Sequence, residues 1–335
     1  MTMMTIQEKK AWTYYQETES KCPNLSRCGR NLNLLSLQGK LDPCYHRDDT
    51  IQMIQRILLR KNKANILLTG VPGCGKTAIV EGLAAEITRR KVGYLEASAK
   101  AEREFKCAIR KWEKSEKQGP EPVREIPVKP PLCDLMIIEL SLNSTISGTK
   151  YRGEFEERIR DMLFECKRNP NIVLFIDELH HMDRVGASEG SVSAAQILKP
   201  ALARNDIRLI GATTTEEKAI LLKDQAFARR MTELEIPQLQ QDAALQTARR
   251  ILENYCQYHN VTTQVSAESL LSQVRYFLPN TVFPDNFINL VDETLAGAVF
   301  AGITNVGSTH FNETLSRLSG QLILNLDETD LSQAS

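Results

Sequence analysis

The feature that most constrains this chain is a glycine-rich segment, residues 70–77, which directly follows the apolar run at 66–68. It has the G-x-x-x-x-G-K-T spacing of a phosphate-binding loop and reads Gly70, Val71, Pro72, Gly73, Cys74, Gly75, Lys76, Thr77. Glycines let backbone N–H groups turn toward phosphate oxygens, and a helix starting there favours negative charge. We therefore predict that Lys76 reaches the phosphates of a nucleotide and that the Thr77 hydroxyl holds Mg²⁺.

The residues after the loop support this interpretation. Ile79, Val80, Leu83 and Ile87 recur at helical spacing, so a strand, a loop and a helix follow one another in the required order. A glycine-rich turn with a chance lysine does not explain that order. Cys74 is interpreted as a small spacer, since redox control would need a thiol pKa lowered by the helix N-terminus.

Bulk properties bound the class of protein. The chain has 335 residues, 42% of them hydrophobic, which suits about two domains with a sizeable core. Its 42 basic and 42 acidic residues cancel, so no overall field favours nucleic acid or an anionic membrane. The eight cysteines form no C-x-x-C pair, and the sequence has no secretory signal and no apolar run of membrane-spanning length. We expect a cytoplasmic protein with free thiols.

Strand and helix patterns alternate through the first two thirds of the chain. An amphipathic helix is expected at 51–60, strands at 65–69, 135–141, 172–176, 207–212 and 232–236, and helices at 76–90, 153–167, 192–204 and 216–229. This order predicts an α/β fold with a parallel sheet covered on both faces. From 237 onward the pattern is helical, with segments at 244–255, 267–277, 285–300 and 310–319. We therefore divide the chain into an N-terminal extension (1–40), an α/β subdomain (41–236) and a helical subdomain with a tail (237–335).

A charged and then proline-rich insertion, residues 99–131, interrupts this rhythm. Phe105, Ile109 and Trp112 share a helical face within it. We interpret the insertion as a charged helix and a stiff linker that lie over the body of the protein. The alternative is a helix that docks a partner, with Trp112 as its anchor.

A second acidic motif follows the strand expected at 172–176. Asp177 and Glu178 come directly after five apolar residues, as suits a central strand buried on both faces. Ligands bind at the carboxyl ends of such strands. Asp177 is therefore placed to hold Mg²⁺, and Glu178 to polarise the water that attacks the γ-phosphate. An acidic helix cap is the simpler alternative, but it does not account for the phosphate loop upstream.

Two weaker polar clusters fit a nucleotide hydrolase. Thr214 closely follows the strand expected at 207–212 and is a candidate sensor of the γ-phosphate. Arg229 and Arg230 precede the last strand, and an arginine directed at a phosphoryl group can raise its transfer rate roughly 10³–10⁵-fold. Alone, each cluster is equally well explained by a turn or by a solvated basic pair.

Taken together, these motifs resemble the first ATPase module of Clp-type AAA+ protein unfoldases such as ClpA, ClpB and ClpC. The matching runs lie, in the family's order, at 38–43, 70–84, 150–158, 175–180, 198–204 and 210–214. The resemblance implies a three-layer P-loop AAA+ core followed by a small helical lid, and a hexameric ring that binds ATP and Mg²⁺ between subunits. It also implies that Thr214 is a sensor and that Arg229 and Arg230 reach into a neighbouring subunit's site.

Tyr151 stands in the run Lys-Tyr-Arg-Gly-Glu-Phe at 150–155, which in this family lines the central pore and grips unfolded polypeptide. The resemblance thus implies threading of a protein client; the alternative is an ATP-dependent assembly switch that threads nothing. A nucleic-acid motor is a third class, which the zero net charge disfavours.

The chain also departs from the family pattern. A family glycine is replaced in His46-Arg47-Asp48, and the lid motif Leu-Pro-Asp-Lys becomes 283–286, Phe-Pro-Asp-Asn. The sequence resembles a stand-alone single module, without the family's large N-terminal domain, second ring or peptidase-docking loop. We therefore expect the insertion or residues 1–40 to recruit the client or an adaptor.

Overall fold

The computed structural model describes residues 4–118, 120–141, 152–183, 194–204 and 206–323. Within them the chain forms two compact units. The α/β unit comprises Met1–Cys44, Asp49–Thr69 and Thr77–Leu234, and the helical unit comprises Tyr45–Asp48, Gly70–Lys76 and Glu235–Ser335. The phosphate loop is thus grouped with the helical unit, and the chain returns to the α/β unit at Thr77.

A six-stranded sheet forms the centre of the described α/β unit. Its strands are β1 (Gly29–Asn31), β2 (Asn65–Thr69), β3 (Met136–Leu140), β4 (Ile172–Ile176), β5 (Arg208–Thr213) and β6 (Met231–Glu235), in the order β1-β3-β4-β5-β2-β6. Strands β3, β4, β5 and β2 are parallel, and β1 runs antiparallel to β3. Every residue of β2 and β4 is buried, as their apolar sequences predict for strands covered on both faces.

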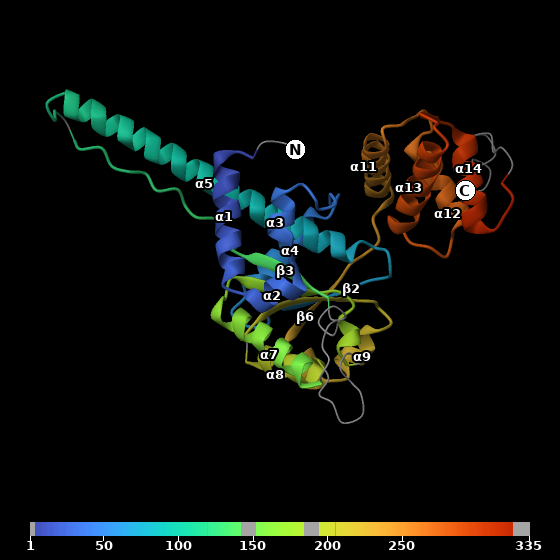
Figure 1. Cartoon of the computed structure of the whole chain (residues 1–335), viewed down its shortest axis with the longest axis horizontal. Coiled ribbons are helices and arrows are strands. Elements are labelled where there is room, and N and C mark those ends of the chain that lie inside the picture. The colour runs from blue at the N-terminus through green and yellow to red at the C-terminus, as the bar shows by residue number, and fades with distance from the viewer. Residues whose placement is uncertain (1–3, 119, 142–151, 184–193, 205, 324–335) are drawn as a thin grey trace. The chain divides into compact units, whose positions relative to one another are not determined.

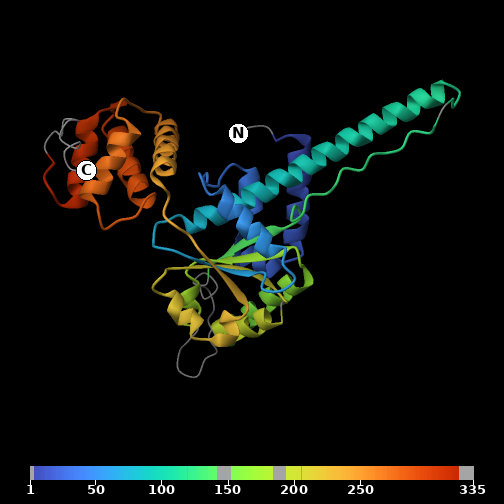
Figure 2. The ribbon, with the colours of Figure 1, turned by 180° about the vertical axis from the view of Figure 1, so that it is seen from behind.

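Helices cover both faces of this sheet (Figures 1 and 2). The helices α3 (Leu32–Leu37), α4 (Asp48–Leu58) and α5 (Lys76–Lys114) lie on one side, and α7 (Arg152–Arg168), α8 (Ala194–Ala203) and α9 (Lys218–Leu222) on the other. Helix α5 buries the predicted stripe, including Ile79, Leu83 and Ile87. The predicted three-layer α/β core is confirmed.

The N-terminal residues form more structure than their weak pattern predicts. Helix α1 (Ile6–Ser20) buries Ala11 and Tyr15 completely in the core, and α2 (Pro23–Cys28) follows it. Thr5 and Glu8 form a capping box, in which Thr5 Oγ1 accepts from the Glu8 N–H at 3.2 Å. The Thr-x-x-Glu spacing is a sequence signal for this helix start, whereas the periodicity of α1 gives little.

The insertion is built differently from the prediction. Helix α5 does not end near residue 90 but continues without interruption to Lys114, and its far part projects from the body together with the returning chain (Figure 1). The prediction that the insertion lies over the body is wrong. Charged pairs one turn apart, such as Lys106 Nζ and Glu102 Oε1 at 2.6 Å, support a helix that has few core contacts. We call residues 92–131 the arm.

A buried charge cluster ties the base of the arm to the α/β unit. Lys91 Nζ lies 2.5 Å from Asp134 Oδ1 and 3.7 Å from the ring centroid of Tyr14 on α1. Lys129, on the returning chain, also pairs with Asp134. Burial acts to raise the pKa of Asp134, but the bonds from Lys129 and Lys91 outweigh it and hold that pKa below its usual value.

The helical unit is built from the four helices that the sequence predicts. They are α11 (Gln241–His259), α12 (Ala267–Phe277), α13 (Asp285–Phe300) and α14 (Ser308–Ser319). Their apolar faces share one core around Leu270, Phe287 and Phe311. A short parallel pair, β7 (Thr262–Thr263) and β8 (Asn305–Val306), was not predicted, because two residues carry no periodicity. None of the helices that the structure describes is long and apolar enough to cross a membrane.

Candidate functional site

The register of the sheet brings two predicted motifs to one edge. Strand β5 lies between β4 and β2, with Gly211 opposite Ile176 and Thr213 opposite Thr69. The acidic motif that follows β4 and the threonines that end β5 therefore leave the sheet side by side. Gly211 also permits a close approach, because a Cβ there would lie 2.3 Å from Leu179 Cδ2.

Thr77 and Asp177 meet directly at this edge. Thr77 Oγ1 donates to Asp177 Oδ2 at 2.6 Å, and Asp177 Oδ1 accepts from the Glu178 N–H at 2.9 Å. Two oxygens that converge in this way fit Mg²⁺, which takes one or two protein ligands and completes its shell with phosphate and water. No group of three metal-ligating side chains is found among the described residues. The sequence predicted both Thr77 and Asp177 as candidates for holding the metal.

The phosphate loop has the backbone that its sequence predicts. Gly73 and Gly75 take φ values of 78° and 89°, which side-chain-bearing residues rarely adopt. Lys76 Nζ donates to the carbonyl oxygens of Gly70 and Val71 at 2.9 and 3.1 Å. Those are backbone partners only, so the ammonium group is held without a counter-charge in the loop. This chemistry fits an anionic phosphate.

A buried arginine holds the phosphate loop from within the helical unit. Arg47 donates to the carbonyl oxygens of Cys74, at 3.2 Å, and of Pro237, at 2.8 Å. His46, which replaces the family glycine, keeps a left-handed φ of 53°. The sequence marked this segment as a departure but gave Arg47 no role. An arginine beside a left-handed residue is no recognisable signal in a single sequence.

A hollow in the helical unit adds a candidate site for a nucleotide base. Its lining includes the apolar side chains of Leu239, Val282 and Phe283, together with Asn286. Asn286 is 7% exposed and donates from Nδ2 to Thr281 Oγ1 at 3.1 Å, whereas its buried Oδ1 accepts no hydrogen bond in the described structure. An unpaired buried acceptor is costly, so an amino group entering the hollow gains a partner there.

Glu178 and Thr214 are joined to two adjacent histidines. Glu178 has a φ of 49°, and its Oε2 lies 3.4 Å from His181 Nδ1. Thr214 Oγ1 donates to Glu217 Oε2 at 2.8 Å, and Glu217 Oε1 lies 3.1 Å from His180 Nε2. The sequence predicted Glu178 and Thr214 separately, but it gave no sign that side chains connect them.

Comparison with known proteins places the chain in a family. The model of the ATPase family associated with various cellular activities (AAA) matches residues 66–237, just over half of the chain. The chain belongs to the AAA family. The phosphate loop, Asp177, Glu178 and Thr214 all lie within the matched residues, so the predicted ATPase is confirmed at the level of the family.

Curated relatives narrow the likeness to Clp chaperones. This AAA protein is 36% identical over 275 residues to the chaperone protein ClpC1, chloroplastic, of Oryza sativa subsp. japonica. It is 37% identical over 292 residues to the chaperone protein ClpB of Aquifex aeolicus. These matches cover 82% and 86% of this chain but only 26% and 25% of the two relatives. The chain therefore spans about a quarter of their length, and the predicted resemblance to Clp-type proteins is confirmed.

Solved structures agree. A closed-state cryo-EM reconstruction of Hsp104 with ATPγS and FITC casein aligns with a TM-score of 0.70 at 31% identity, covering 92% of this chain and 48% of that one. An S. cerevisiae Hsp104–ADP complex aligns with a TM-score of 0.68 at 32% identity, covering 91% and 47%. The fold of this AAA protein is therefore the fold of about half an Hsp104 chain.

The remaining predicted residues are those expected to act on a neighbouring subunit or on a protein client. Arg229 and Arg230 follow the short helix α10 (Gln225–Ala228), and both are exposed at the start of β6. Exposure suits side chains that would reach another molecule. Tyr151 lies outside the described residues.

Proposed function

We propose that this AAA protein binds ATP with Mg²⁺ and hydrolyses it to remodel protein clients. The observation that carries the proposal is the 2.6 Å contact between Thr77 of the phosphate loop and Asp177 of the acidic motif. It joins two motifs that are a hundred residues apart in the sequence, and each is chemically suited to a phosphate-bound metal.

Each residue of the proposed site has a distinct task. Lys76 and the backbone N–H groups of the loop would bind phosphate oxygens, and Thr77 and Asp177 would hold Mg²⁺. The metal would supply positive charge that neutralises the phosphates. Glu178 would take a proton from the attacking water. Thr214 would contact the γ-phosphate and so report its presence.

The ATP step is tested with the full chain and a Lys76→Ala variant. We expect magnesium-dependent turnover by the wild-type protein and loss of ATP binding by the variant, because the loop then lacks its ammonium group. Lys76 bonds only to two backbone carbonyls, so thermal unfolding should change little. Equal turnover by both proteins would overturn the proposal.

We further propose a hexameric ring in which Arg229 and Arg230 complete the ATP site of the neighbouring subunit. Their exposure and their place in the family's motif order support this. The test mixes two inactive variants, Glu178→Gln and Arg229→Ala/Arg230→Ala. In mixed rings, the first supplies arginines and the second supplies Glu178, so turnover should partly return. Mixtures as inactive as their parents would contradict a shared site.

Threading through the ring is the finer proposal for how clients are remodelled, with Tyr151 as the client contact. It draws support from the Tyr151 motif and from Hsp104, which has been reconstructed together with FITC casein. A Tyr151→Ala variant should keep ATP turnover and lose unfolding of a fluorescently labelled casein. Unfolding that survives this change, while Glu178→Gln abolishes it, would favour the alternative of an assembly switch without threading.

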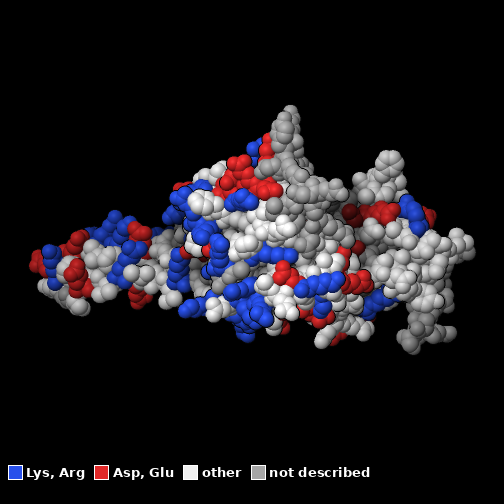
Figure 3. All heavy atoms as spheres, turned by 90° about the horizontal axis from the view of Figure 1, so that it is seen from below, with Lys and Arg blue, Asp and Glu red and all other residues white. Residues whose placement is uncertain are grey.

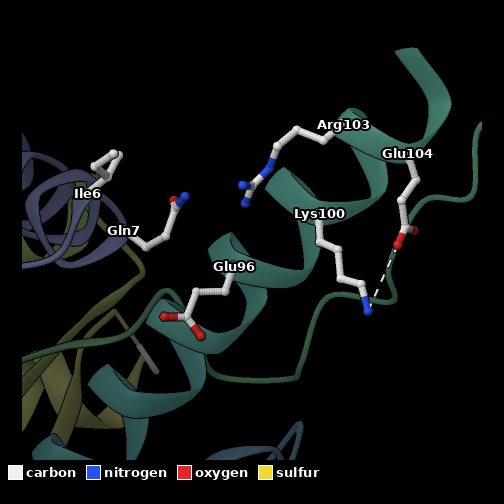
Figure 4. A pocket seen from close by; sticks show the side chains of 6 residues that line it. All are labelled: Ile6, Gln7, Glu96, Lys100, Arg103 and Glu104. Carbon is white, nitrogen blue, oxygen red and sulfur yellow. Dashed lines mark ion pairs between the residues drawn. The ribbon is translucent and has the colours of Figure 1, made fainter. Parts of the chain in front are cut away.

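The arm is our candidate for recruiting a client or an adaptor. Val123, Ile126 and Val128 on its returning segment are 86%, 76% and 92% exposed, although their side chains are apolar. Near its base, side chains of α1 and α5 line a shallow hollow that holds two acidic and two basic residues (Figure 4): Ile6, Gln7, Glu96, Lys100, Arg103, Glu104. Apolar groups beside mixed charges suit a protein partner.

The surface charge of the arm bears on the third class considered above, a nucleic-acid motor. Positive and negative side chains intermingle along the arm (Figure 3), which is unlike the basic stripe of a nucleic-acid motor. Binding of single-stranded DNA at low salt would contradict this view.

We also propose a reducing, cytoplasmic location: the neighbouring thiols of Cys22 and Cys166 are both unlinked, and burial raises the pKa of Cys22 to about 11.

A further inference from the structure

We propose that His181 positions the Glu178 carboxylate for hydrolysis and that the His180–His181 pair couples it to Thr214. The inference rests on the proposed ATP hydrolysis and deepens it, because neither histidine has a role in the scheme above. The rate of ATP hydrolysis would then depend on the contact that Thr214 makes with phosphate.

Local backbone geometry dictates the first contact. Residues Leu179–Asp183 form a 3-10 helix, and the His181 N–H donates to the Glu178 carbonyl oxygen at 2.9 Å. Glu178 comes directly before this helix and has a left-handed φ of 49°. With this backbone conformation, Glu178 Oε2 lies 3.4 Å from His181 Nδ1.

Side-chain contacts continue without a gap from this pair to Thr214. The rings of His181 and His180 meet edge to face, with centroids 4.1 Å apart. His180 Nε2 lies 3.1 Å from Glu217 Oε1, and the other oxygen of Glu217 accepts from Thr214 Oγ1 at 2.8 Å. A shift of the Thr214 hydroxyl toward phosphate would therefore pull on Glu217 and, through the two rings, on Glu178.

The central histidine is held rigidly enough to transmit such a shift. His180 is 5% exposed, and both of its ring nitrogens have partners, because Nδ1 lies 3.1 Å from Thr213 Oγ1. The Glu217 carboxylate at Nε2 can only accept, so a neutral ring carries its proton on Nε2, and Nδ1 then accepts a hydrogen bond from the Thr213 hydroxyl. Rotation of the His180 ring would therefore break its contacts with both Glu217 and Thr213.

The contact between His181 and Glu178 is not explained by stability. The two side chains are 34% and 67% exposed, and exposed pairs of this kind add little to the free energy of folding. The contact instead engages one carboxylate oxygen and leaves the other for a water molecule. Orienting a base in this way is the usual use of a polar neighbour in a hydrolytic site.

The test measures steady-state ATP hydrolysis by the full chain and a set of variants. His181→Ala should lower kcat roughly 10-fold to 100-fold and leave KM for ATP nearly unchanged, because binding does not involve this contact. His181→Asn should recover most of kcat, since its amide N–H₂ stands near the place of Nδ1. In a double variant with Glu217→Gln, kcat should fall no lower than in the worse single variant, as for residues acting as one unit.

A matched control comes from the helical unit. His259 Nε2 pairs with Asp292 Oδ1 at 2.8 Å, so His259→Ala removes a histidine–carboxylate pair remote from the motif residues in sequence and should leave kcat as in the wild type. Unchanged kcat in His181→Ala, or no recovery in His181→Asn, would overturn the inference. Normal ATP turnover by Glu178→Gln would instead overturn the proposed function itself. Failure of the His181 inference and failure of the proposed function can thus be told apart.

Discussion

Helix α5 carries two very different regions on one continuous element. At its start, Lys76 and Thr77 bond to backbone carbonyls and to Asp177, groups that a bound nucleotide and metal would engage. Fifteen residues later, Lys91 is fixed by Asp134 and stacks on Tyr14. The same residue type thus serves ligand chemistry at one place and architecture at the other.

The difference teaches how to recognise function in this molecule. Residues at the start of α5 are half-buried and make few contacts beyond the proposed site, so their loss should affect turnover and spare the fold. Lys91 at the arm base is buried and paired, so its loss should affect the fold and spare turnover. The predictions below test this division.

Among the substitutions in α5, the largest effect is expected for Thr77→Ala, with Thr88→Val as its matched control on the same helix. Losing the hydroxyl that we propose to hold Mg²⁺ should lower ATP turnover roughly 10²–10³-fold. Thr88 is 3% exposed and accepts from Asn33 Nδ2 at 3.0 Å, so Thr88→Val should cost about 1–2 kcal/mol of unfolding free energy. Turnover assays and urea denaturation measure the two effects. Equal losses of turnover in both variants would break the comparison.

Lys91→Met should destabilise the α/β unit by about 1–3 kcal/mol, because Asp134 loses its buried cationic partner and keeps the half-exposed Lys129. Lys106→Met is the control, since it removes an exposed pair with Glu102 that adds little to the free energy of folding. Chemical denaturation compares the two. A similarly small change in the unfolding free energy of both variants would show that the Lys91–Asp134 pair does not stabilise the fold.

The lowered pKa of Asp134 predicts how its ion pairs with Lys91 and Lys129 respond to acid. A carboxyl whose pKa is lower in the folded state stabilises the fold above its unfolded pKa, and that stabilisation is lost as pH falls through the folded pKa. Unfolding free energy should therefore fall more steeply below about pH 4 in the wild type than in Asp134→Asn. Parallel curves for the two proteins, measured by thermal unfolding across pH, would contradict this.

Removing the arm should leave the ATP chemistry nearly intact. A variant in which residues 97–128 are replaced by about six Gly and Ser residues keeps Lys91, Lys129 and Asp134. We expect turnover within about twofold of the wild type and loss of activity on a protein client. Loss of turnover would assign the arm to the ATP site or to assembly instead.

The smallest effect is expected for polar substitutions on the exposed edge of the arm. Val123→Ser and Ile126→Ser should change the unfolding free energy by no more than about 0.5 kcal/mol, because both side chains face solvent. Differential scanning calorimetry would detect a larger change. A marked loss of stability would mean that this edge packs against another part of the protein.

The sequence predicted most of the fold for clear physical reasons. The buried strands β2 and β4 are continuous apolar runs bounded by polar residues, and α12 and α13 have one apolar face each and match their predicted bounds. The N-terminal helices and β1 were missed because α1 buries only Ala11 and Tyr15 deeply. The arm was misjudged because charged residues permit a helix but do not say where it points.

The candidate site divides in the same way. Lys76, Thr77, Asp177 and Glu178 follow strands at fixed spacings, so sequence order alone predicts them. Arg47, Asn286, Glu217 and the two histidines depend on contacts between segments that are distant in the chain or on side-chain orientation. Such contacts arise from tertiary packing, for which a single sequence carries no periodic signal.

The most direct test of the whole account is ATP turnover by Glu178→Gln, measured together with ATP binding. The substitution keeps the shape of the side chain and removes only its capacity to accept a proton from water. The account predicts that binding remains while turnover falls roughly 10²–10⁴-fold. A variant that binds ATP and still turns it over at the wild-type rate would contradict the assignment of Glu178 and, with it, the proposed mechanism.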